Sequence, residues 1–478
     1  MPRFAPSPTP SRRLVAEAAT PTAPSRRGLL AAAAAGCACC VALGGGLVGP
    51  WSRSAAANVP AAPARPLHGR LDEAARAIEP RMIEWRRDIH QHPELGNQEV
   101  RTAGIAAAHL KRLGYDVRER VAVTGVVATL RGGAGPGPVL ALRADMDALP
   151  VAEEVDLPFR SRARAQWAGE EVGVMHACGH DCHVAILMAA AEVLAAHRAD
   201  LRGTVKLLFQ PAEEKLPRGE IGGARRMLDE GAFEDPKPDA VFGLHVMNGW
   251  NSGTIGYRAG PVMASSDTFR ITVLGRQTHG AEPWNGVDPI VIGAQIVSAL
   301  QTIQSRQVDA GDASVLTVGV FRGGNRDNII PDRATMEGTL RTFDERRREF
   351  MMRRVKEIAE GVARSMDGSA EVVWEPNGYA TTVNDPALTE RMAPSLARVV
   401  GTDRLRLNPR AMPSEDFSFL AQRAPGLFFF VGITPQGVDP RTTPANHSPR
   451  FRVDEAGLLP GLRAMLHLTA DYTGSGAA

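Results

Sequence analysis

Short, continuously apolar runs separated by segments of helical periodicity constrain this 478-residue chain more than any other feature of its sequence. The runs lie at 125–131, 139–143, 204–210 and 239–245. Strands that are buried on both faces are continuously apolar, and parallel strands need a crossover, which is usually a helix. The sequence therefore predicts an α/β fold, with a mostly parallel sheet and helices on both of its faces.

Apolar residues at helical spacing predict the helices of this first region, at 71–90, 98–113, 181–197 and 222–230. From about Ser265 the pattern changes to alternating strands and two long helices. The predicted strands are 268–275, 313–321, 335–343 and 370–375, and the predicted helices are 287–306 and 344–364. Strand-helix-strand-strand-helix-strand is the ferredoxin-like order, so the sequence predicts an inserted α+β domain.

The chain then returns to the first domain, with a core strand at Phe428 and a final helix from Asp454. This gives four predicted parts: an export signal and linker at 1–66, the first domain at 67–264 and 377–478, and the insert at 265–376. Net charge is +2, and positive and negative residues are well mixed. We therefore expect no nucleic-acid partner.

The N-terminal segment resembles a twin-arginine export signal. Arg26 and Arg27 precede a weakly apolar run, and the small residues at 55–57 suit a signal peptidase. We therefore expect an exported protein, periplasmic or secreted. A disordered leader and a lipoprotein acylated at Cys37 are the alternatives. Three consecutive glycines at 44–46 argue against a stable membrane span.

Potential metal ligands are concentrated in the segment 175–183, MHACGHDCH, which holds Cys178 and His180. Two cysteines four residues apart do not staple a fold of this size, so we interpret Cys178 as a ligand and not as half of a disulfide. Further carboxylates follow two of the predicted strands, at Asp145, Asp147, Glu213 and Glu214. His245 is expected to end a third strand, and His447 lies near the C-terminus. Thiolate, imidazole and carboxylate together suit a first-row divalent cation. Because open α/β sheets bind ligands beyond the carboxyl ends of their strands, we expect these residues to meet at one edge.

These motifs resemble the amidohydrolase branch of the co-catalytic metallopeptidases, which includes hippurate hydrolase, N-acyl-amino-acid amidohydrolases and indoleacetyl-amino-acid hydrolases. The resemblance runs from RRDIHQHPELGNQE, beginning at Arg86, to NHSPRFRVDEAGL, ending at Leu458. It implies two divalent metal ions per subunit, with zinc or manganese expected. The ligands that it implies are Cys178, His180, Glu214, His245 and His447.

The resemblance also suggests catalytic roles. Glu213 is expected to move the proton of a metal-activated water, and Asp147 to orient a histidine ligand. Family members use the insert as a lid and dimerisation domain. His279 is then expected to reach the partner subunit's site and stabilise the oxyanion of the transition state.

Asn328 and Arg341, both in the insert, are expected to bind the substrate's carboxylate. The chain departs from the family pattern at Gln277, Thr278 and Trp284, which leaves the substrate open.

The sequence thus predicts a homodimeric, metal-dependent hydrolase that cleaves the amide bond of small N-acyl amino acids. A dipeptidase or carboxypeptidase with the same site is the first alternative. An inactive metal-dependent binding protein is the second, and Glu213 argues against it, because a binder needs no spare carboxylate beside its ligand. Two further alternatives concern Cys178. It could be a nucleophile with His180 as its base, or a buried free cysteine without a catalytic role.

Overall fold

The computed structural model describes residues 59–63, 66–217 and 219–474. The paired arginines and Cys37 of the predicted export signal lie outside these residues, so export stays a prediction. Within the described ranges, no helix combines the length and the apolar character that a membrane crossing requires.

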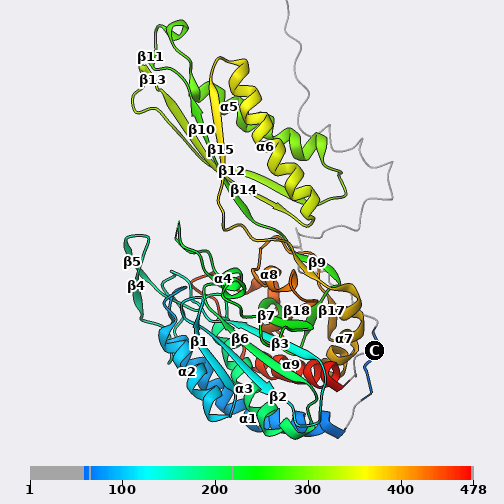
Figure 1. The fold of residues 1–478 in the computed structure, drawn as a ribbon. Helices are drawn as coiled ribbons and strands as arrows, with labels where there is room; N and C mark the ends of the chain where they lie inside the picture. The colour runs from blue at the N-terminus through cyan, green and yellow to red at the C-terminus, as the bar shows by residue number, and fades with distance from the viewer. Residues whose placement is uncertain (1–58, 64–65, 218, 475–478) are drawn as a thin grey trace, which may run out of the picture. The chain divides into compact units, whose positions relative to one another are not determined.

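Eight strands form the larger sheet, in the order β1-β2-β6-β3-β7-β18-β8-β17 (Figure 1). The central neighbours, from β6 through β3 and β7 to β18, are parallel, and β1, β2 and β8 add antiparallel pairs. The predicted mostly parallel sheet is therefore confirmed. Its strands are β1 (Asp116–Val121), β2 (Gly125–Arg131), β3 (Val139–Asp145), β6 (Thr204–Gln210), β7 (Ala240–Asn251), β8 (Ile255–Tyr257), β17 (Leu405–Leu407) and β18 (Gly426–Thr434).

Helices cover both faces of this sheet, because strands such as β18 have apolar side chains on both faces. Phe429 and Val431 join the core on one face, whereas Phe428 and Phe430 join the core on the other. The first core is completed by α1 (Pro66–Gln91), α2 (Val100–Arg112), α3 (His180–Ala196), α7 (Pro386–Val400) and α9 (Leu458–Gly474). The second is completed by α4 (Gly223–Asp229) and α8 (Phe417–Ala421), on the opposite side of the sheet in Figure 1.

A second sheet has four antiparallel strands in the order β12-β14-β10-β15. Phe269, Ile271 and Val273 of β10 pack with Ile292 and Ile296 of α5 in a core of their own. The elements are β10 (Asp267–Leu274), α5 (Pro289–Thr302), β12 (Ser314–Gly323), β14 (Arg333–Thr342), α6 (Glu345–Ser365) and β15 (Ser369–Trp374). This is the ferredoxin-like order predicted for the insert. The domain boundaries at 66, 264 and 376 stay predictions.

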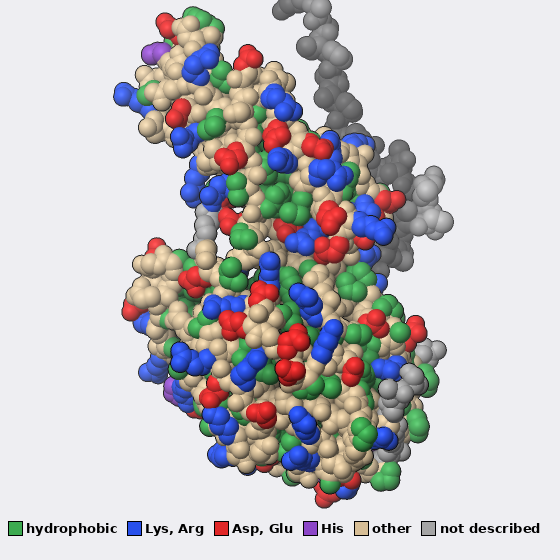
Figure 2. Space-filling view, viewed as in Figure 1, with side chains coloured by type: hydrophobic (Ala, Val, Ile, Leu, Met, Phe, Trp, Pro, Cys, Tyr) green, Lys and Arg blue, Asp and Glu red, His purple; other side chains and the backbone are tan. Residues whose placement is uncertain are grey.

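Short elements complete the described chain. The paired strands are β4 (Arg164–Trp167) with β5 (Glu170–Gly173), β9 (Gly260–Met263) with β16 (Thr382–Asn384), and β11 (Thr278–His279) with β13 (Ile329–Ile330). The short helices are η2 (Arg198–Asp200), η3 (Pro283–Asn285), η4 (Ile303–Gln307), η5 (Pro440–Thr442) and η6 (Glu455–Gly457). Positive and negative side chains are interspersed over the described part of the face drawn in Figure 2, as the sequence predicts.

One expectation about the site strands was wrong. His245 does not end its strand, because β7 continues to Asn251. β7 pairs with β3 only over Ala240–Gly243 and then runs on beside β18. His245 therefore emerges where β3 no longer covers β7, and this still brings it to the edge where the other ligands lie.

Candidate metal centre

The approach to α3 is shaped by Gly179, which has a φ of +90°. A Cβ atom at this position would lie 2.3 Å from Cγ2 of Val246, so only glycine fits the turn. The turn places Cys178 just before α3 and His180 as its first residue. A single tight bend thus presents two of the predicted ligands to the same edge of the sheet.

The carboxylates lie at the ends of two neighbouring parallel strands, β3 and β6. Asp145 is the last residue of β3, and it pairs in register with Gln210, the last residue of β6. Glu213 and Glu214 follow β6 after a turn in which Ala212 has a φ of +49°. The predicted convergence at the carboxyl ends of the strands is therefore observed.

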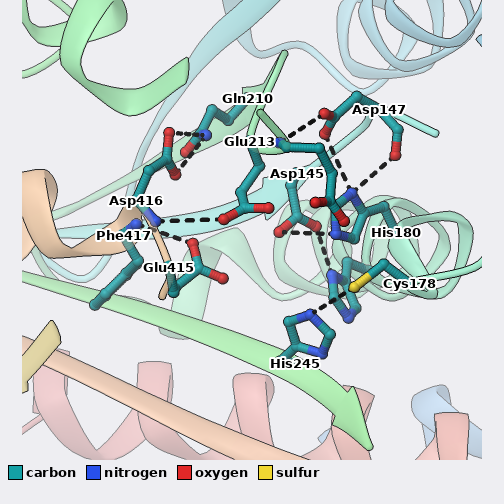
Figure 3. Close-up of polar contacts among 12 residues, drawn as sticks. Asp145, Asp147, Cys178, His180, Gln210, Glu213, His245, Glu415, Asp416 and Phe417 are labelled. Carbon is teal, nitrogen blue, oxygen red and sulfur yellow. Dashed lines mark hydrogen bonds and ion pairs between the residues drawn. The ribbon is translucent and has the colours of Figure 1, made fainter. Parts of the chain in front are cut away.

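The predicted ligands form overlapping clusters of donor atoms that lie within 4.8 Å of one another. Cys178 takes part in two of them, and the sets are Cys178–His180–His245, Cys178–Glu214–His447 and His180–Glu213–Glu214. Sγ of Cys178 lies 3.4 Å from Nε2 of His245 and 3.2 Å from Nε2 of His447. Nε2 of His447 lies 3.0 Å from Oε1 of Glu214. Figure 3 shows Cys178, His180 and His245 together beside Glu213.

The histidine rings are held in the orientation that metal ligands need. Nδ1 of His180 lies 2.8 Å from the carbonyl oxygen of Asp147 and 3.2 Å from its Oδ1. Nδ1 of His245 lies 2.8 Å from the carbonyl oxygen of Val246. Each Nδ1 therefore donates its proton to oxygen, which leaves Nε2 as a lone-pair donor. Nε2 of His180 is buried without a hydrogen-bond partner among the described residues. The donor set thus fits a divalent cation.

Asp147 connects two ligands, because its second carboxylate oxygen accepts a hydrogen bond from the backbone N–H of Glu214 at 2.8 Å. The carboxylate therefore holds the ring of His180 and the backbone of Glu214 at once. This contact accords with the orienting role expected from the sequence.

Glu213 lies in a different environment from Glu214. Its carboxylate is buried, and Oε1 accepts a hydrogen bond from the backbone N–H of Asp416 at 3.3 Å. Burial, and then the charges of Glu415, Glu214 and Asp416, raise the pKa of Glu213 well above its usual value. A carboxylate with a raised pKa accepts a proton more readily, which suits a general base.

Arg143 supplies the positive charge that this buried acidic group requires. Its guanidinium is fully buried and donates to Gln210 Oε1 at 2.8 Å and to Asp145 Oδ2 at 2.6 Å. It also donates to Glu415 and Asp416, each at 2.9 Å. Asp145 in turn contacts Nδ1 of His183 at 2.5 Å. Asp145 is thus held between a guanidinium and an imidazole, behind the donor cluster.

A cavity of about 520 Å³ opens onto the donor cluster. Its wall combines the ligands with apolar side chains and two cations, Lys215 and Arg341. The lining residues are Cys178, Glu213, Glu214, Lys215, His245, Met247, Met263, Ser266, Arg341, Asn377, Tyr379, Met412, Pro413, Ser414, Glu415, Asn446 and His447. Burial, and then the charge of Arg341, lower the pKa of the Lys215 ammonium.

Of the insert residues predicted to contact the substrate, Arg341 lines this cavity. His279 is exposed in β11, and Asn328 lies directly before β13, which pairs with β11. The backbone N–H of Gly280 donates to the carbonyl oxygen of Asn328 at 2.8 Å. Neither His279 nor Asn328 lines the cavity, so their roles stay predictions.

Sequence reasoning missed Arg143, Lys215 and Tyr379. Arg143 had a usable signal, since an arginine that ends an apolar strand two residues before Asp145 needs buried acidic partners. Tyr379 donates through its hydroxyl to the carbonyl oxygen of Glu213 at 2.5 Å, and nothing in its local sequence indicates this. Lys215 has no usable signal either, because a lysine beside two glutamates is the common pattern of a solvated surface.

Comparison with known proteins gives concordant matches. The model of peptidase family M20/M25/M40 matches residues 141–471. Thermostable carboxypeptidase 1 of Saccharolobus solfataricus is 38% identical over 84% of this chain and 98% of its own length. N-acetylcysteine deacetylase of Bacillus subtilis is 36% identical over 80% of this chain and 95% of its own. The crystal structure of Bacillus subtilis YXEP protein, described as a dinuclear metal binding peptidase from the M20 family, has a TM-score of 0.70. It is 33% identical, with 84% of this chain and 99% of that chain covered.

Proposed function

The chain belongs to peptidase family M20/M25/M40 and is a metal-dependent hydrolase of amide bonds, and we propose that its substrates are small N-acyl amino acids. The observation that carries this proposal is the cavity in which Glu213, the metal-ligand cluster and the cation Arg341 meet. An N-acyl amino acid has an amide bond, on which Glu213 and the metal centre can act, and a carboxylate, which Arg341 can bind.

We propose that Cys178, His180, Glu214, His245 and His447 hold two divalent ions. A bound divalent cation lowers the pKa of water from 15.7 toward about 7 and polarises the amide carbonyl. Glu213 accepts the proton of the attacking water on a carboxylate oxygen and then donates it to the leaving nitrogen. Its burial beside Glu415 and Asp416 favours that proton uptake. Arg341 holds the substrate's carboxylate.

Zinc or manganese suits this donor set. A thiolate and imidazoles favour zinc, whereas carboxylate oxygens also accept manganese. The metal content of protein purified without chelators distinguishes the two.

A dipeptidase or carboxypeptidase remains the second candidate. The similarity to a thermostable carboxypeptidase favours it, and a peptide's C-terminal carboxylate would meet the same Arg341. An activity screen of metal-loaded protein decides between the two, with acetyl-, benzoyl- and indoleacetyl-amino acids beside dipeptides. Faster turnover of N-acyl amino acids than of dipeptides is expected. Turnover restricted to peptides would contradict the proposal, and no turnover at all would favour an inactive binding protein.

We further propose that the protein is an exported homodimer. In this arrangement the insert forms the subunit contact, and His279 reaches the partner subunit's site to stabilise the oxyanion. The exposure of His279 supports this idea, because an exposed imidazole is accessible to a second subunit. Asn328, close to the strand pair that carries His279, would then also act across the dimer.

A further inference from the structure

Two cationic side chains line the cavity. One follows a strand of the larger sheet, and the other belongs to a strand of the four-stranded sheet. Lys215 directly follows Glu214, and Arg341 belongs to β14. Both side chains belong to the lining of the same cavity. Two like charges on one cavity wall repel, and an anion bound between them relieves that repulsion.

The nearby carboxylates of Asp267 and Glu375 form their ion pairs with other arginines. Asp267 accepts two hydrogen bonds from Arg348, at 2.7 Å each, and Glu375 lies 3.8 Å from Arg270. Among the described residues, neither Lys215 nor Arg341 forms an ion pair. The cavity therefore offers two cations that are not paired with carboxylates.

Neutral oxygens position the two cations without neutralising them. Nζ of Lys215 donates to the hydroxyl of Thr268 at 2.7 Å, and Arg341 donates to the carbonyl oxygen of Met412 at 2.9 Å. An ammonium has three N–H donors and a guanidinium five, so both retain donors for a ligand. Lys215 is also exposed, which leaves its amine accessible from the cavity.

The chemistry of an N-acyl amino acid places its anion at this point. Only the α-carbon separates the amide nitrogen from the carboxylate carbon, so the carboxylate lies close to the bond that breaks. Lys215 is adjacent in sequence to Glu214 and two residues from Glu213, and all three side chains line the cavity. Arg341 lines the same cavity and can bind the same carboxylate with its planar fork.

We propose that Lys215 and Arg341 together bind the free carboxylate of the amino-acid half, and that Lys215 selects N-acyl amino acids over their neutral carboxamides. This inference rests on the proposed function and adds Lys215 to it as a specificity residue. Met247, Met263 and Met412, whose side chains are apolar and adaptable, then line the space left for the substrate's apolar part.

The test compares N-acetyl-methionine with N-acetyl-methioninamide and follows acetate release. Lys215→Met keeps the length of the side chain and removes its charge. It should raise KM for the free acid about 10- to 100-fold, since a charge-assisted hydrogen bond is lost. The kcat for the acid, and both constants for the carboxamide, should change little. Lys215→Arg should restore most of the affinity for the acid. An unchanged ratio of acid to carboxamide KM in Lys215→Met would overturn the inference.

Two further variants make the result specific. Lys237→Met removes an exposed lysine away from the cavity and should behave as wild type. Arg341→Met should raise KM for the acid as Lys215→Met does. The double variant should lose less than the product of the two single losses, because both cations bind one carboxylate. Strictly multiplicative losses would instead mean that the two side chains bind different groups.

Binding separates this inference from the proposed function. If wild type releases acetate from neither compound, the metal-loaded Glu213→Gln variant is titrated with both in a calorimeter. A preference for the acid that Lys215→Met abolishes would support the carboxylate site although the proposed function fails. Equal affinity for acid and carboxamide would overturn the inference by itself.

Discussion

At the scale of single residues, two adjacent glutamates have acquired different environments. Glu214 faces His447 and Cys178, and its backbone is held by Asp147. Glu213 turns toward Asp416 and is buried among like charges. A division of labour was predictable from the sequence, because adjacent carboxylates after a buried strand point to different partners. The partners themselves come from distant segments and were not predictable.

The two glutamates should respond differently to the same substitution. Glu213→Gln keeps the shape of the side chain but cannot accept a proton, so it should retain metal and lower kcat about 10²- to 10⁴-fold. Glu214→Gln removes a charged ligand and should lower the bound metal itself. Metal analysis and turnover on an N-acyl amino acid measure both effects. Near-wild-type turnover in Glu213→Gln would show that another group moves the proton.

The residues that sequence reasoning missed share a physical cause. Lys215 has the local context of a solvated charge, and its importance depends on Arg341, which is more than a hundred residues away. Tyr379 acts through a contact with a backbone carbonyl, which leaves no pattern in the sequence. The ligands were found because their residue types are rare in combination, whereas contacts of common residue types carry no such signal.

At the scale of elements, strands were predicted better than the connections between them. The strands 125–131 and 204–210 agree with β2 and β6 residue for residue, because buried strands have sharp apolar limits. The strand of His245 continued beyond its predicted end because its second half pairs with β18. A helix was predicted at 287–306. In the structure the corresponding helix, α5, ends at Thr302, and a π-helical turn follows it.

Helices α1, α7 and α9 are joined by the buried carboxylate of Asp471. It lies 3.0 Å from His68 of α1 and accepts hydrogen bonds from Ser395 and Arg398 of α7 at 2.5 and 2.8 Å. Burial alone would raise the pKa of Asp471, but the hydrogen bonds from these residues and the charge of Arg398 lower it below the usual 3.8. The ionised carboxylate therefore stabilises the contact between these three helices.

The stability that Asp471 contributes should depend on pH. A lowered folded-state pKa means that the contribution is full above the unfolded-state value of about 3.8 and is lost as the pH falls through the lower folded value. Asp471→Asn should thus destabilise by about 1–3 kcal/mol at pH 7. The difference from wild type should narrow below pH 4 in urea unfolding. Asp439→Asn, in an exposed pair with Arg441, is the matched control and should change little. A difference that persists unchanged at pH 3 would contradict this account.

At the scale of the whole molecule, the sequence predicted both sheets and their places along the chain, because each sheet has its own apolar pattern and its own core. What it could not provide was the relation between His279 and the metal ligands. In the proposed dimer that relation depends on contacts between subunits, for which the chain has no local pattern.

Mixing two inactive variants tests the dimer. His279→Ala lacks the proposed oxyanion donor, and Glu213→Gln lacks the general base. Random exchange makes half of the dimers mixed, and each mixed dimer has one intact composite site, so roughly a quarter of wild-type activity should return. Exchange that is demonstrated with labelled subunits, without any return of activity, would place His279 in its own subunit's site or outside catalysis.

Export has a test in the N-terminal segment. The twin-arginine pathway reads the paired arginines, so the double variant Arg26→Lys and Arg27→Lys should leave full-length protein in the cytoplasm. Cell fractionation followed by immunoblotting measures the distribution. Unchanged delivery outside the cytoplasm would mean that this segment is not a twin-arginine signal.

The central claim is that amide hydrolysis depends on metal held by Cys178, His180, Glu214, His245 and His447. The most direct measurement is turnover of an N-acyl amino acid by protein stripped of metal with a chelator, with metal content determined on the same sample. Activity should disappear with the metal and return when zinc, manganese or cobalt is added, because the cation activates the attacking water. Full activity in a demonstrably metal-free sample would contradict the account.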